Sequence, residues 1–119
     1  MPTTHTPMTT RQVLLAAADL IEHDGLCQGE YWPGQGNGTP YTPGLPCCVI
    51  GSIAVTAGVT IEHSLPTSPL PAVDVLCRVV LKHRVPQPDR LVDWNDQEDR
   101  TAGEVAAAMR GAAAALPTR

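Results

Sequence analysis

The stretch TTRQVLLAAADLIEHDG, residues 9–25, decides the fold class. Its apolar side chains recur at helical spacing and predict one buried face. The residues on that face are Val13, Leu14, Ala17, Leu20 and Ile21. Thr9 and Gln12 have the spacing of a capping box, and Gly25 supplies the left-handed position that commonly ends a helix. We therefore predict a helix from about Arg11 to His23.

Three further segments have the same helical character. The first, residues 46–57, begins at a proline, which suits a first helical position because its missing N–H would be unpaired there. The second lies between Pro71 and Pro86, and the third runs from Ala102 to about Leu116 behind a capping box of Thr101 and Glu104. The predicted fold is an all-α, single-domain bundle of about four helices.

Two Pro- and Gly-rich connections separate these helices, at residues 31–46 and 60–71. The first contains four prolines, four glycines and every aromatic residue except Trp94. Loops of more than about 12 residues in a compact domain tend to be functional or disordered. A disordered linker rarely collects aromatic side chains, so we expect this loop to pack on the body. Residues 1–9 are predicted to be a flexible tail and residues 10–116 the single domain.

Composition restricts the class of protein. The chain has 119 residues, a net charge of −4 and one lysine, which argues against nucleic-acid binding through phosphate contacts. Its first ten residues contain no apolar signal segment, and no run approaches the ~18 apolar residues that a membrane span needs. We therefore expect a cytoplasmic monomer or homodimer, not bound to membranes, with its four cysteines reduced.

Several short motifs use residue types that a plain helical core does not require. They are Cys27-Gln28-Gly29, Cys47-Cys48-Val49-Ile50-Gly51, Trp94-Asn95-Asp96 and Arg100-Thr101-Ala102-Gly103-Glu104-Val105. With the run Leu14–Leu20, these motifs resemble a domain-of-unknown-function family of small proteins from actinobacteria and their phages. The resemblance spans roughly residues 11–115 and implies a soluble protein, but no particular activity.

A cysteine nucleophile is one hypothesis for these motifs. Cys48 lies at the predicted start of the second helix, where backbone N–H groups and the helix dipole stabilise a thiolate. Cys27 follows His23 by four residues, and Asn95 or Asp96 could orient the histidine of such a dyad. Alternatively, the cysteines are packed as small apolar side chains.

The segment around Trp94 allows two interpretations. Trp94 could fill the core of a chain without phenylalanine, while Asn95 or Asp96 bonds the backbone of a turn. Alternatively, Asn95, Asp96 and Arg100 line a polar binding pocket with Trp94 as its wall. Gln28 could likewise either complete a turn or contact a ligand.

Metal binding has weaker support. Asp93, Asn95, Asp99 and Glu104 occupy positions one, three, seven and twelve of a calcium-binding EF-hand loop. Glu98, however, replaces the glycine required at position six, and the capping box explains Glu104 without a metal. The cysteines lack the paired spacing of a zinc site. We therefore predict neither a metal nor a cofactor.

Taken together, small size, a mildly acidic surface and two long loops favour a protein-binding or regulatory module. The alternative is a small enzyme or small-molecule-binding protein that uses a Cys/His/Asn/Asp pocket. The sequence leaves open whether the chain is an enzyme. It also leaves open whether its partner is another protein or a small molecule.

Overall fold

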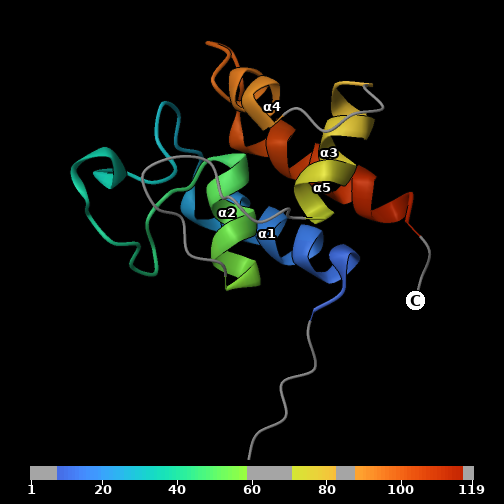
Figure 1. Ribbon diagram of the computed structural model, residues 1–119, viewed down its shortest axis with the longest axis horizontal. Helices are drawn as coiled ribbons and strands as arrows, with labels where there is room; N and C mark the ends of the chain where they lie inside the picture. The colour runs from blue at the N-terminus through green and yellow to red at the C-terminus, as the bar shows by residue number, and fades with distance from the viewer. Residues whose placement is uncertain (1–7, 59–70, 83–87, 117–119) are drawn as a thin grey trace, which may run out of the picture.

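The computed structural model of this chain describes residues 8–58, 71–82 and 88–116. Within these residues the chain forms α-helices and one short 3-10 helix, η1 (Gln35–Asn37), and no strand beyond an isolated bridge. The α-helices are α1 (Thr10–Asp24), α2 (Val49–Ala57), α3 (Pro71–Val80), α4 (Pro88–Asn95) and α5 (Ala102–Ala114) (Figure 1). The prediction of a small all-α domain is confirmed.

Both predicted capping boxes are present. The Thr9 hydroxyl accepts the Gln12 N–H at 3.1 Å, and the Gln12 side chain accepts the Thr9 N–H at 2.8 Å. Thr101 and Glu104 make the same reciprocal pair at the start of α5. These side chains satisfy backbone N–H groups that have no partner within the helix, which fixes where α1 and α5 begin.

The core lies where α1 crosses α5 and is completed by α2, α3 and α4. Helix α1 packs most extensively on α5, and next on α2. Small side chains allow this close approach, since the buried residues of the two helices include five alanines. The largest fully buried apolar side chains are Leu14, Ile21, Ile50, Ile53, Leu76, Leu91 and Met109. Residues 26–48 project from one side of this bundle, drawn in cyan and green in Figure 1.

The predicted start of the second helix was wrong. The helix begins at Val49 with Cys48 as its N-cap, not at Pro46, because the Cys47 backbone pairs with Gly25 and Cys27 in the isolated bridge. Within the described residues there are five α-helices, where the sequence predicted about four, because residues 88–95 form the short helix α4. Helix α4 is only eight residues long, too short for its apolar spacing to be recognised in the sequence.

The predicted ends of the other helices differ from the structure by a few residues at most, and α5 ends at Ala114 rather than near Leu116. The second Pro-rich connection and most of the predicted N-terminal tail lie outside the described residues. In the part of the chain that the structure describes, no helix is both long enough and apolar enough to span a membrane.

Candidate functional site

The long Pro- and Gly-rich connection is folded around its aromatic residues. We call residues 28–46 the Pro/Gly loop. The Trp32 ring is buried, and its Nε1–H donates to the Thr39 carbonyl at 2.7 Å. Tyr41 packs edge-on against Trp32 with ring centroids 5.7 Å apart, and Tyr31 packs against the helical core. The loop therefore has a small aromatic core of its own that rests on the bundle.

A single carboxylate holds the tip of the loop. The Glu30 side chain accepts the Gly34 N–H at 3.3 Å and the Gly36 N–H at 3.2 Å. Gly34 and Gly38 adopt left-handed backbone angles on either side of η1, which glycine accepts without strain. Residues 31–46 contain no charged side chain, so the half-buried Glu30 is the one charged residue of the loop.

The two ends of the loop are tied to each other. Leu26 and Cys47 form a parallel bridge, in which the Cys27 N–H donates to the Cys47 carbonyl at 2.9 Å. The Cys47 N–H donates in turn to the Gly25 carbonyl at 3.3 Å. The chain thus leaves and re-enters the bundle at one place.

Asn95 extends this bridge with its side chain. In an uninterrupted parallel pair, the next hydrogen bond would join the Val49 N–H to the Cys27 carbonyl. Instead, the Asn95 carboxamide lies between them: its Oδ1 accepts the Val49 N–H at 2.8 Å, and its Nδ2 donates to the Cys27 carbonyl at 3.1 Å. Asn95 is completely buried. Its side-chain amide therefore takes the place of one backbone hydrogen bond of the pair and links α4 to both ends of the loop.

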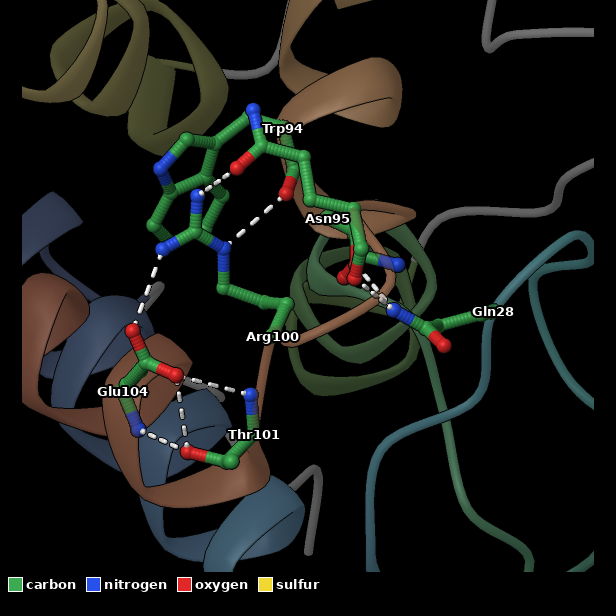
Figure 2. Close-up of polar contacts among 7 residues, drawn as sticks. Gln28, Trp94, Asn95, Arg100, Thr101 and Glu104 are labelled. Atoms are coloured by element: carbon green, nitrogen blue, oxygen red, sulfur yellow. Dashed lines mark hydrogen bonds and ion pairs between the residues drawn. The ribbon is translucent and has the colours of Figure 1, made fainter.

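The side chains next to Asn95 repeat this pattern. Gln28 Nε2 donates to the Asn95 carbonyl at 2.9 Å and to the Gln97 carbonyl at 2.8 Å (Figure 2). Asp96 Oδ1 accepts both the Gly29 N–H at 3.1 Å and the Asn95 Nδ2–H at 2.9 Å. Carbonyls at a helix end lack partners within the helix, and Gln28 supplies one for the end of α4. These two bonds hold Gln28 against the end of α4.

Gly51 lets the loop approach the first turn of α2. An added Cβ at this position would lie 2.5 Å from the Tyr31 carbonyl oxygen, too close for any side chain. The Cys48 N–H donates to the same Tyr31 oxygen at 3.0 Å. We refer to residues 26–29, 47–51 and 94–97, which meet here, as the junction.

Arg100 connects the junction to α5. Its guanidinium stacks 4.2 Å from the centroid of the Trp94 ring, and its Nε donates to the Trp94 carbonyl at 3.0 Å. The other nitrogens reach Gln97 Oε1 at 2.6 Å and Glu104 Oε2 at 3.3 Å. Figure 2 shows this chain of contacts running from Gln28 through Arg100 to the capping box of Thr101. Trp94 is half-buried and forms the floor of this stack.

The chain matches a family of unknown function, DUF6197, over residues 5–115. It belongs to that family. No curated protein and no solved structure matches it. The family resemblance expected from the motifs is thereby confirmed, and the matched span contains every residue of the junction.

The cysteines of this DUF6197 chain are buried thiols. Cys48 Sγ does accept the Gly51 N–H at 3.2 Å, as its position at a helix start predicts. Burial outweighs that hydrogen bond, however, and raises the pKa of Cys48 to about 12. Burial likewise raises the pKa of Cys47 to about 12, and that of Cys27 above its usual value. The direction is opposite to the thiolate stabilisation expected from sequence, because desolvation disfavours the charged form.

The remaining candidate catalytic residues do not assemble around a thiol. The His23 side chain is 87% exposed, and its Nδ1 bonds Asp24 Oδ1 at 2.7 Å. Asn95 and Asp96 do come close to Cys27, but the bonds of Asn95 are to the Cys27 backbone rather than to its sulfur. The structure therefore places four of the five candidates in the junction, all except His23, and there Asn95 and Asp96 bond backbone groups of the loop ends.

The calcium-loop residues are also used in other ways. Asp93 and Asn95 lie in the last turn of α4 rather than in a loop, and Asn95 Oδ1 already accepts a backbone N–H. Glu104 is shared between the capping box and Arg100. Among the described residues, no group of three or more His, Cys, Asp or Glu could hold a metal ion.

Sequence reasoning missed the role of Glu30 and the full role of Asn95. A glutamate followed by a run of glycines is a signal for Glu30, since free N–H groups of such a loop need an acceptor. Asn95 bonds Cys27, 68 positions away, and no sequence spacing shows such a contact.

Proposed function

We propose that this DUF6197 protein is a protein-binding module whose contact surface is the Pro/Gly loop. One observation carries the proposal: polar residues of the Cys27-Gln28-Gly29 and Trp94-Asn95-Asp96 motifs hold this loop in place. Gln28, Asn95 and Asp96 all bond the segments where the loop joins the bundle. Gly51 has no side chain, and this allows the loop to pack against α2 at Tyr31.

A loop fixed in this way is suited to recognition. Binding residues are often carried on loops that a rigid scaffold positions. A loop that is ordered before it meets its partner loses less conformational entropy on association, which favours affinity. Residues 34–44 contain four glycines, so a loop that was disordered before binding would lose much conformational entropy when it became ordered on the partner.

The exposed surface of the loop indicates how a partner would be held. Apart from the half-buried Glu30, it consists of prolines, glycines and hydroxyl or amide side chains. The exposed positions are Gln28, Gly29, Pro33, Gly36, Asn37, Gly38, Thr39, Pro40, Thr42, Pro43 and Gly44. A partner would therefore contact proline rings and loop backbone groups rather than charges. Binding through such a surface depends little on salt, because screening acts on charges.

The alternative of an enzyme with a Cys/His/Asn/Asp pocket gains no specific observation in its favour. Burial raises the pKa of the Cys27 and Cys48 thiols, and the Asn95 carboxamide already bonds Val49, Cys27 and Asp96. We therefore carry forward the protein-binding proposal alone.

The proposal can be tested with a photo-crosslinking residue placed at Asn37, which is exposed on the loop. The matched control carries the same residue at Ala107, which is exposed on α5. In cells that make the protein naturally, we expect one protein adduct from position 37 and none from position 107. An excess of the unlabelled chain should remove the adduct.

The affinity of the purified partner for variants of the chain then shows whether the partner binds the loop or was cross-linked by chance. Thr42→Lys, at an exposed loop position, should weaken affinity at least tenfold, while Ala107→Lys should leave it unchanged. Equal adducts from both positions, or equal affinities of both lysine variants, would refute the loop as the contact surface.

A further inference from the structure

We propose that residues 39–43, Thr-Pro-Tyr-Thr-Pro, are a polyproline II ligand for an uncharged, aromatic-lined groove on the partner protein. The inference rests on the proposed function, because it takes the Pro/Gly loop as the contact surface. It adds which segment of the loop is bound and what kind of surface on the partner binds it. We call residues 39–43 the proline segment.

The spacing of the prolines is the first observation. Pro40 and Pro43 are three positions apart, and a polyproline II helix has about three residues per turn. Two prolines at this spacing therefore lie on one face of the helix, roughly 9 Å apart at a rise of ~3.1 Å per residue. Grooves lined with aromatic rings recognise segments that have this Pro-x-x-Pro pattern.

The conformation of the segment favours polyproline II. A proline ring fixes φ at about −65°, and the residue before a proline is restricted to extended or polyproline II angles. One of these two restraints acts on every residue of the segment except Tyr41, which also has a negative φ. The structure accordingly places residues 39–42 outside any helix, strand or turn.

Hydrogen bonds anchor the segment near both ends. The Thr39 carbonyl accepts the Trp32 Nε1–H at 2.7 Å. The Thr42 carbonyl accepts the Leu45 N–H at 3.3 Å, in a turn where Gly44 has a φ of 98°. Because the rest of the loop holds the segment in this way, the segment loses little conformational entropy when a partner binds.

The side chains of the segment divide between two faces, as a three-residue repeat requires. Pro40, Thr42 and Pro43 are exposed, whereas Tyr41 is half-buried and packs edge-on against Trp32. One face of the segment thus rests on the aromatic core of the loop, and the face with both prolines meets solvent. The segment belongs to the part of the chain that projects from the bundle in Figure 1.

Backbone carbonyls complete the ligand. The Pro40 and Tyr41 carbonyls accept no hydrogen bond from another residue that the structure describes. Tryptophan N–H and tyrosine O–H groups in an aromatic groove are donors that suit such carbonyls. The segment carries no charged side chain, so these donors and the aromatic rings hold it without acidic or basic side chains of the partner.

The first test uses a synthetic peptide of about ten prolines, which forms polyproline II and competes for such a groove. An excess of this peptide should abolish the protein adduct that forms from position 37, whereas a flexible Gly-Ser peptide of equal length should not. An adduct that resists the proline peptide would overturn the inference, while the loop would remain the contact surface. If position 37 gives no adduct, the contact surface and the inference are refuted together.

Three alanine variants give a second measure with the purified partner. Pro40→Ala and Pro43→Ala should each weaken affinity about tenfold, as truncation of a central interface residue does. Pro33→Ala is the matched control, since Pro33 is exposed in the same loop but outside the segment, and it should change affinity by less than about twofold. All three prolines are exposed, so the variants should melt at similar temperatures. Unchanged affinity in the first two variants, or an equal loss in the third, would overturn the inference.

Discussion

The interface between α1 and α5 and the junction beneath the Pro/Gly loop stabilise the fold in different ways. The helix interface buries small apolar side chains such as Ala17, Ala106 and Ala113, and an exposed ion pair lies at its edge. The junction instead depends on the hydrogen bonds of individual polar residues, above all Asn95 and Gln28. Apolar packing tolerates exchanges of similar volume, whereas a buried amide has no substitute. This difference explains why the recognisable short motifs gather at the junction.

The strongest test of this comparison is Asn95→Ala. The change leaves the Val49 N–H and the Cys27 carbonyl buried without their partner. Each such group costs about 1–3 kcal/mol, so we expect a loss of about 4 kcal/mol in the free energy of unfolding, measured with urea. Asn37→Ala, at an exposed loop position, should change it by less than about 0.5 kcal/mol. Similar small losses for both variants would show that the junction does not stabilise the fold.

A second test uses alkaline pH. The pKa of Cys48 is about 12 in the folded protein, against an ordinary value of 9.0. Above pH 9 the unfolded state releases this proton while the folded state keeps it, so stability falls as pH rises from 9 towards 12. The slope should be about 1.4 kcal/mol per pH unit for this thiol. Cys48→Ser retains a side chain that can cap α2 and should reduce the slope by about this amount, while Cys47, whose pKa burial also raises to about 12, keeps its own contribution. An equal slope in that variant would contradict this assignment.

Two glycines sharpen the comparison further. Gly51→Ala places a methyl group 2.5 Å from the Tyr31 oxygen and should destabilise the fold by about 2 kcal/mol. Gly111→Ala, in α5, meets no atom within 4 Å and should stabilise it by up to about 1 kcal/mol through helix propensity. Thermal unfolding of the two variants should therefore shift in opposite directions. A shift in the same direction would mean that the loop can move away from α2 at little cost.

The smallest effect is expected at the edge of the helix interface. Arg110 bonds Asp19 at 2.7 Å and Glu22 at 2.7 Å, but all three side chains are substantially exposed. Exposed ion pairs contribute little, because water and salt screen them. Arg110→Ala should leave the melting temperature nearly unchanged at physiological salt. A clear fall that persists in high salt would show that the interface needs this pair.

The sequence by itself determined the all-α fold, the two capping boxes and the positions of α1 and α5. These features depend on residues three to seven positions apart, and helical spacing expresses such local contacts directly. It also marked the residues of the junction as unusual, although it left open whether Asn95 and Gln28 form turns or a pocket.

Only the tertiary structure showed which backbone groups these two side chains bond. Asn95 bonds residues 46 and 68 positions away, and Gln28 bonds carbonyls 67 and 69 positions away. Whether a polar side chain faces a ligand or a distant backbone depends on which segments the folded core brings together. The same holds for the thiols, since a helix start favours a thiolate but burial, which only the fold imposes, has the larger effect on the pKa of Cys48.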